Sequence, residues 1–328
     1  MIGEYLLFSL AGAIVMDLFF GEPSNSLHPV AWIGKLIEFF IPKLKEHDDN
    51  STKREKEREN GTIFSISLII TFGLAIHFLT FISFHLLGSV AMIIVSALIL
   101  KITIAIRSME DYAEAVINAL ERHDMHDARH NLSMIVRRET KNLDEQHVLS
   151  GTIECISEST VDGIVSPLFY YSFFGPAGAF IYRVINTLDS MVGYSDNYYK
   201  DIGCMSARLD TFANYLPARI TALLMVMSAN IIRADWKNSM QILQRDHDKT
   251  LSSNAGYPMA TMAGALRIKL EKIGHYSLGD GYEDITIEKC LTAISIMKMT
   301  TILFCIIFCV PLIILLNLSG WWILLFGF

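Results

Sequence analysis

Charged residues are scarce in this chain. Only 19% of its 328 residues are Asp, Glu, Lys or Arg, against about 25% in a typical soluble domain. None of them lies in residues 62–86 or 299–328. Such stretches predict membrane-spanning helices, because about 20 residues cross the hydrocarbon core of a bilayer. The composition therefore excludes an ordinary water-soluble enzyme and indicates a multi-pass protein of the lipid bilayer.

Other patterns that the sequence lacks narrow the class further. The five cysteines form no CxxC pair, so we expect neither a zinc site nor a disulfide framework. The net charge is −7 with no long basic block, which argues against a nucleic-acid partner. The first apolar segment lacks a basic leader and a cleavage site, and we expect it to be a retained helix. Without alternating apolar–polar runs or repeats, the pattern favours an all-α polytopic membrane helical bundle.

The chain is expected to form one integral membrane domain over residues 1–328, with polar segments between the spans. Residues 42–61 are mostly charged and predict a mobile linker. Residues 107–163 and 234–298 carry most of the remaining charge and predict polar helical modules. The expected spans are about 2–20, 62–86, 88–106, 165–185, 216–232 and 300–320.

The distribution of basic residues predicts the orientation. Residues 1–20 contain no Lys or Arg, whereas residues 35–61 contain seven. Basic loops stay in the cytoplasm, so we expect the N-terminus outside and the linker inside the cell membrane. The active face is then predicted to be cytoplasmic.

The fourth apolar stretch contains helix breakers. Pro167 and the run from Gly175 to Gly178 (Gly-Pro-Ala-Gly) interrupt residues 165–185. We favour a broken or re-entrant pair of half-helices, with a full crossing as the alternative. Irregular backbone at membrane depth is tolerated where it lines a polar cavity. A broken segment would keep residues 186–215 near the cytoplasmic face.

Several acidic residues have the spacing of a site. Glu154, Glu158 and Asp162 recur every four residues and would lie on one helical face. Their mutual repulsion suggests a compensating Mg²⁺, which binds carboxylates together with substrate phosphates. A solvated helix face is the alternative. Asp17 ends the first span, where an ionisable group is a functional candidate by default, with an interfacial position as the alternative.

Two dense clusters of polar residues flank the broken span. An arginine fork suits bidentate capture of phosphate or carboxylate, so these clusters are the strongest local indication of a site. The turn around Asn254 that precedes a small-residue helix is a weaker candidate. The clusters comprise Arg183, Asn186, Asp189, Ser190 and Tyr194, and then Arg208, Asp210, Asn214 and Arg219.

Read in order, the motifs resemble one family, the CbiB/CobD family of cobalamin biosynthesis, whose members are membrane-bound adenosylcobinamide-phosphate synthases. The resemblance extends over about residues 5–280. The motifs are DLFFGEPSNSLHPVAWIGKLI (17–37), IVRRET (135–140), IECISESTVDGIVSPLF (153–169), YRVINTLDSMVGY (182–194), ARLDTFANYLPARI (207–220) and SSNAGYPMATMAGALRIKL (252–270).

The resemblance implies an ATP-dependent carbon–nitrogen ligase. A propionate carboxylate of the corrinoid adenosylcobyric acid would be joined to aminopropanol, its phosphate or ethanolamine phosphate. Activation of the carboxylate by ATP implies Mg²⁺ and cations around the transferred phosphoryl group. Other enzymes of the cobalamin pathway and further copies of the chain are expected partners.

The resemblance also implies roles for individual residues. Catalytic roles are expected for Asp189, Glu158, Asp162 and Asp210, and metal binding for Glu158, Asp162 and Asp189. Substrate binding is expected for Asp17, Glu22, His28, Arg138, Arg183, Asn186, Ser190, Arg208, Asn214, Arg219 and Asn254.

The chain departs from the family pattern at several positions, among them Arg137 for Gly, Glu139 for Asp and Ser157 for Ala. Ser159 replaces Asn, Thr211 replaces Asp, Ser253 replaces Pro, and Met259 stands where an acidic residue often occurs. These departures bear on metal binding and on the choice of amine. The alternatives are a membrane prenyltransferase with a Mg²⁺–pyrophosphate site and a non-catalytic corrinoid-binding or transport protein.

Overall fold

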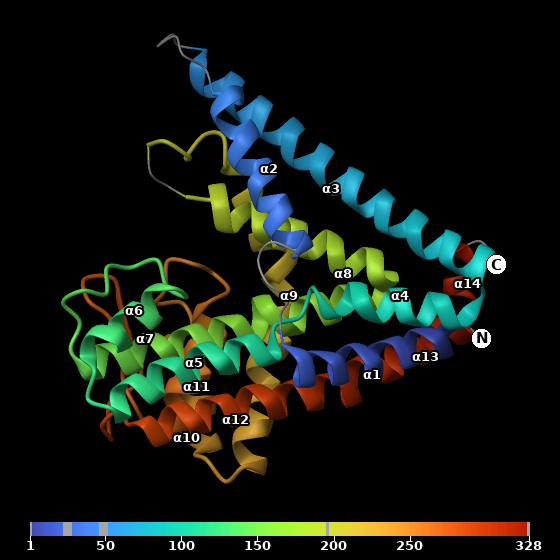
Figure 1. The fold of residues 1–328 in the computed structure, drawn as a ribbon. Helices are drawn as coiled ribbons and strands as arrows, with labels where there is room; N and C mark the ends of the chain where they lie inside the picture. The colour runs from blue at the N-terminus through green and yellow to red at the C-terminus, as the bar shows by residue number, and fades with distance from the viewer. Residues whose placement is uncertain (1, 22–27, 46–51, 195–196, 327–328) are drawn as a thin grey trace. The chain divides into compact units, whose positions relative to one another are not determined.

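The computed structural model describes residues 2–21, 28–45, 52–194 and 197–326. These residues form helices joined by turns, with one short β-hairpin within the described ranges (Figure 1). The all-α prediction is confirmed. The expectation of no strands is wrong at residues 270–278, where each strand has only three residues, too few for an alternating pattern to be recognised.

The chain divides into two compact units, each with its own internal contacts. Unit 1 comprises Met1–Ile104, Ser166–Ala213 and Cys309–Phe328. It contains α1 (Ile2–Phe20), α2 (Pro29–Leu44), α3 (Lys53–Leu87), α4 (Ser89–Lys101), α8 (Ser166–Val192), the first part of α9 (Cys204–Ile231), α13 (Val310–Leu318) and α14 (Trp321–Phe326).

Unit 2 comprises Ala105–Val165 and Asn214–Phe308. It contains α5 (Ile106–Glu121), α6 (Met125–Ser133), α7 (Glu145–Ser159), the π-helix η1 (Thr160–Val165), the rest of α9, α10 (Trp236–Asp246), α11 (Gly256–Leu266), β1 (Leu270–Lys272), β2 (Tyr276–Leu278), α12 (Ile287–Phe304) and most of η2 (Cys305–Cys309).

One apolar cluster in the core of unit 1 joins α2 to the second half of α8, with residues of α3 and α4 packed against them. Ile33, Ile37 and Ile41 recur every four residues and form the buried stripe of α2. They belong to one apolar cluster with Val184 and Leu188 of α8. This packing holds the polar residues of α8 in a fixed orientation.

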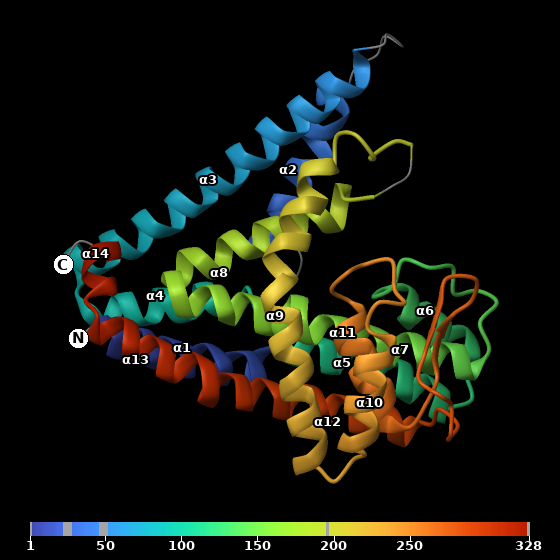
Figure 2. The ribbon, with the colours of Figure 1, turned by 180° about the vertical axis from the view of Figure 1, so that it is seen from behind.

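Helix α8 is broken at Gly175, as the sequence predicts. Gly175 has φ 65° and ψ −156°, a conformation that is essentially restricted to glycine. Pro176 follows and cannot donate a backbone hydrogen bond. The chain therefore turns back on itself, and Figure 2 shows the two arms of α8 meeting in this turn.

In unit 2 the β-hairpin packs against α7. Strands β1 and β2 are antiparallel, with Leu270 opposite Leu278 and Lys272 opposite Tyr276. The backbone N–H of Glu271 donates to Ser150 Oγ of α7 at 3.0 Å. The hairpin thereby brings Tyr276 to the acidic face of α7.

Five helical stretches in the described part of the chain are long and apolar enough to cross a membrane, in keeping with a multi-pass protein. The predicted span 216–232 lies in α9, which is not among them. The N-terminal orientation and the cytoplasmic face stay predictions. The five stretches are Ile2–Phe20, Lys53–Leu87, Ser89–Glu121, Glu145–Val192 and Ile287–Leu318.

The predicted linker 42–61 is partly helical. Residues 53–61 form the first turns of α3, whereas residues 46–51 lie outside the described residues. The charges of this segment find partners, since Lys45 pairs with Glu57 at 3.4 Å and Arg58 with Asp201 at 2.8 Å.

Candidate functional site

In unit 1 the second arm of α8 carries a polar face. Arg183, Asn186, Asp189 and Ser190 are all half-buried on this arm. The Asn186 side-chain amide donates to Asp210 Oδ1 of α9 at 3.4 Å. The structure therefore brings the α8 cluster and the start of α9 together.

Two arginines of unit 1 have uncommitted guanidinium groups. Arg183 Nε is buried and has no hydrogen-bond partner among the described residues. Arg208 is exposed, and within the same residues no ion pair engages it. Such cations are suited to receive an anionic substrate group.

Unit 2 contains a buried network around Glu154. Arg138 pairs with Glu154 Oε2 at 3.2 Å, and Ser150 Oγ donates to Glu154 Oε1 at 2.7 Å. The Tyr276 hydroxyl donates to Glu154 Oε2 at 2.8 Å. Burial and the charge of Glu154 raise the pKa of Tyr276, which keeps this hydroxyl protonated as a donor. Glu154 is thus held by three donors, which indicates a positioning role.

Glu158 lies one turn after Glu154 on the same helix. It interacts electrostatically with Glu154, Arg138 and Lys272 of β1. The α-helix ends at Ser159 and continues as a π-helix, in which side chains four residues apart no longer lie one above the other. Asp162 therefore does not continue the face that Glu154 and Glu158 share. Glu158 is therefore the carboxylate of this row that adjoins both the Glu154 network and Lys272.

A second site in unit 2 forms around Arg219. Its guanidinium lies 3.5 Å from the ring centre of Tyr215 and 4.3 Å from that of Tyr257. Its Nη1 donates to Asn254 Oδ1 at 3.2 Å and to the Tyr215 carbonyl at 2.5 Å. Arginine stacked on aromatic rings keeps its planar fork in one orientation. The sequence predicted Arg219 and Asn254, and the structure brings them together.

The remaining candidates lie elsewhere. Asp17 is fully buried in α1, and the His28 ring accepts from the Val30 N–H at the start of α2. Asn214 is buried in α9. Glu22 lies outside the described residues. These positions identify no further cluster by themselves.

Known proteins support one classification of this chain. A family model described as "CobD/Cbib protein" matches residues 10–305. A probable cobalamin biosynthesis protein CobD of Methanothermobacter thermautotrophicus is 40% identical over 292 residues, which cover 89% of this chain and 93% of that protein.

The chain belongs to the CobD/CbiB family.

Other relatives in this family agree. A probable CobD protein of Methanocaldococcus jannaschii is 37% identical over 90% of this chain and 95% of its own length. A CobD protein of Dehalococcoides mccartyi is 38% identical over 84% of this chain and 87% of its own length. No solved structure matches the chain. CobD/CbiB membership supports a role in cobalamin biosynthesis.

Metal binding by this CobD/CbiB protein stays a prediction. In the described part of the chain, no three His, Cys, Asp or Glu side chains come together as a metal cage. Mg²⁺ at phosphoryl-transfer sites takes only one or two carboxylates together with substrate phosphates. Glu158 and Asp162 belong to unit 2 and Asp189 to unit 1.

Sequence reasoning missed four residues that the structure adds to the candidate site. Tyr215 and Tyr257 stack on Arg219, while Tyr276 and Lys272 approach the acidic face of α7. The Tyr276 hydroxyl oxygen also lies 3.7 Å from Sδ of Met259, one of the departures from the family pattern. The i,i+4 spacing of Tyr215 and Arg219 could have indicated the first of these contacts.

Proposed function

We propose that this protein is an adenosylcobinamide-phosphate synthase. It would join a propionate carboxylate of adenosylcobyric acid to the amine of aminopropanol phosphate, aminopropanol or ethanolamine phosphate. Each turnover would form one amide bond and convert one ATP to ADP and phosphate. Membership of the CobD/CbiB family supports this assignment.

The observation that carries the proposal is the fixed orientation of Arg219. Its guanidinium is stacked on Tyr215 and Tyr257, and Nη1 is committed to Asn254. Its Nε and Nη2 donors make no hydrogen bond with the described residues, so they can receive a carboxylate or phosphate in a bidentate fork. Such a group is what an enzyme with anionic substrates needs.

The carboxylates are assigned to metal binding and proton transfer. MgATP supplies the phosphoryl group that makes the carboxylate a competent electrophile when it is bound. Glu158 and Asp162 in unit 2, and Asp189 and Asp210 in unit 1, are the candidate Mg²⁺ ligands and bases. Because an ammonium cannot attack, one of them accepts its proton.

The other cations and amides bind and orient substrates. Arg183 and Arg208 offer uncommitted guanidinium groups for phosphate, and Asn186 and Ser190 lie on the same arm of α8 as Arg183. Arg138 stays with Glu154, which assigns it to positioning rather than to direct contact. We place this chemistry at the cytoplasmic face of the cell membrane, where ATP is available.

The direct test uses the full chain in detergent with adenosylcobyric acid, aminopropanol phosphate and MgATP. Mass spectrometry should detect the amide product and ADP in equal amounts, and both should disappear when ATP is omitted. Exchange of the amine then defines the acceptor. A folded sample that forms no amide with any of the three amines would contradict the ligase assignment and favour corrinoid binding without catalysis.

A further inference from the structure

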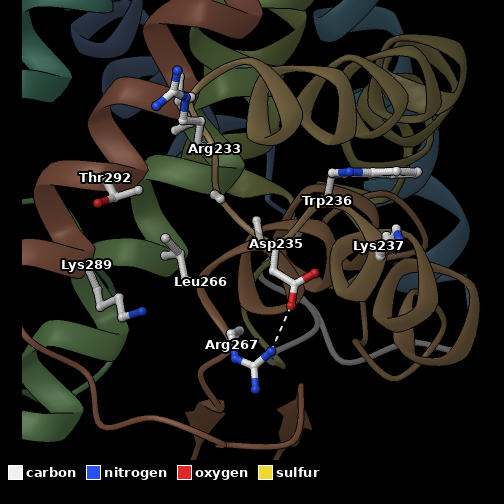
Figure 3. A pocket seen from close by; sticks show the side chains of 11 residues that line it. Arg233, Asp235, Trp236, Lys237, Leu266, Arg267, Lys289 and Thr292 are labelled. Carbon is white, nitrogen blue, oxygen red and sulfur yellow. Dashed lines mark hydrogen bonds and ion pairs between the residues drawn. The ribbon is translucent and has the colours of Figure 1, made fainter.

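A pocket of about 590 Å³ lies in unit 2, away from the candidate site residues. Four basic side chains and one acidic side chain line it, together with a threonine (Figure 3). Lys289 and Thr292 of α12 lie on one side, and the segments that follow α9 and α11 lie opposite them. The charged lining residues are Arg233, Asp235, Lys237, Arg267 and Lys289.

Two of these arginines have an unusual backbone conformation. Arg233 has φ 64° and Arg267 has φ 59°, and His123 is the one other non-glycine residue with positive φ in the described ranges. Both arginines follow the last turn of a helix, where glycine is the favoured residue. The N–H groups of Ala234 and Ile268 reach back to the carbonyls of Ala229 and Ala263, which closes each helix in the same way.

A positive φ is higher in free energy for arginine than for glycine, so arginine at both positions destabilises the backbone. Strain of this kind at two residues of one pocket points to a requirement for their side chains. The two helix ends thus place two arginines in the lining of the same pocket.

The cations of the pocket outnumber their partners. Arg267 pairs with Asp235 at 2.8 Å and with Glu283 at 3.0 Å. Lys289 pairs with the same Glu283. Arg233 and Lys237 form no ion pair with any residue that the structure describes. The pocket therefore carries an excess positive charge, which favours an anionic ligand.

The surroundings of the pocket indicate a membrane interface. Lys289 and Thr292 lie near the start of Ile287–Leu318, a candidate membrane span. On α9, Leu223, Met227 and Ile231 recur every four residues and are about half exposed, and this apolar stripe ends just before Arg233. Exposed Trp236 follows, and tryptophan with nearby lysine and arginine is typical of the headgroup level.

We propose that this pocket binds the phosphate group of an anionic phospholipid, with Arg233 as a direct ligand. The apolar stripe on α9 would lie against the acyl chains, and Lys237 would add to the attraction of the surface. The site is independent of the ligase proposal, because it contains none of the residues assigned to that reaction.

Native mass spectrometry of the delipidated full chain tests this proposal with phosphatidylglycerol, phosphatidylcholine and inorganic phosphate as probes. Phosphatidylglycerol should bind more tightly than phosphatidylcholine. Arg233→Gly and Lys237→Gln should each weaken its binding about fivefold. Because Arg233→Gly relieves the backbone, its Tm should be no lower than that of the wild type, which separates lost binding from lost folding.

Two control variants match these changes. His123→Gly relieves the same backbone conformation outside the pocket, and Lys141→Gln removes an exposed lysine of unit 2. Both should leave lipid binding unchanged. Equal binding of the two lipids, or unchanged binding by Arg233→Gly, would overturn the proposal. If inorganic phosphate binds as tightly as phosphatidylglycerol, the pocket recognises free phosphate, and the proposal of a lipid ligand is overturned.

Discussion

The rings of Tyr170 and Tyr182 stack with their centroids 5.4 Å apart and their planes 11° from parallel, although the two residues are 12 positions apart in one helical segment. In a straight helix that separation corresponds to about 18 Å. The stack therefore demonstrates that α8 is a hairpin of two arms. Its second arm carries Arg183, Asn186, Asp189 and Ser190, so the fold of the hairpin positions the polar cluster of unit 1.

The turn of this hairpin should not tolerate a side chain. Gly175→Ala places Cβ in a conformation that only glycine adopts easily and should destabilise the protein by about 1–3 kcal/mol. Thermal unfolding in detergent measures the loss. Gly12→Ala is the matched control, since its Cβ would make an ordinary contact 3.5 Å from that of Ala97. Equal Tm values for the two variants would argue against a strained turn.

Asp189 and Arg208 are expected to act in the ligase reaction. Asp189→Asn removes a charge and Arg208→Lys removes a planar fork, and each should lower turnover at least about tenfold, or about 1.4 kcal/mol. Product formation with ADP release is the measurement. Arg54→Lys, at a side chain that is 85% exposed, should have no effect. Near-normal rates in both site variants would contradict their assigned roles.

Because Arg219 stacks on Tyr257, substitutions of these two residues should lower the catalytic efficiency to different degrees. Arg219→Lys loses the bidentate fork and should lower kcat/KM about tenfold. Tyr257→Phe keeps the ring over the guanidinium and should stay near the wild-type value, whereas Tyr257→Leu should raise KM. Arg122→Lys, at an exposed ion pair with Asp127, serves as the control. If Tyr257→Phe and Tyr257→Leu behave alike, the ring does not position Arg219.

A buried carboxylate in unit 2 makes stability depend on pH. Burial opposes ionisation of Asp246, but hydrogen bonds from Arg245, Lys249 and the Gly279 N–H outweigh it and lower its pKa below the ordinary 3.8. Ionised Asp246 therefore stabilises the folded protein above pH 3.8, and this contribution is lost as the pH falls below that value.

The Tm difference between the wild type and Asp246→Asn measures this contribution. It should be largest near neutral pH and should shrink toward pH 3 (about one unit below the unfolded pKa). Asp248→Asn, at an exposed carboxylate nearby in the chain, is the matched control variant. A constant Tm difference for Asp246→Asn across this range would refute the linkage.

The hairpin of α8 also predicts the side of the membrane on which residues 186–215 lie. A hairpin returns the chain to the side from which it came, so Lys200→Cys in a cysteine-free background should react only with reagents that reach the cytoplasm. Membrane-impermeant maleimide on intact cells and on inverted vesicles gives the comparison. Labelling on intact cells would show that the segment faces outward.

Much of the fold follows from local chemistry that the sequence displays. Residues 62–86 have no charged side chain, and their helix follows from hydropathy alone. The break at Gly175 follows from a glycine and a proline in succession. By contrast, the π-helix at Thr160–Val165 and the β-hairpin at residues 270–278 are short and carry no periodic pattern.

The candidate site likewise has features that follow from the sequence and features that depend on the tertiary structure. Arg183, Asn186 and Asp189 share a helical face by spacing, so the sequence by itself determined that they lie on the same side of the helix. Only the tertiary structure decided that Tyr276 reaches Glu154, which lies 122 positions earlier in the chain, and that Arg219 meets Tyr257 and Asn254. Helical spacing is set within a few residues by backbone hydrogen bonds, whereas these contacts depend on how whole helices and the hairpin pack.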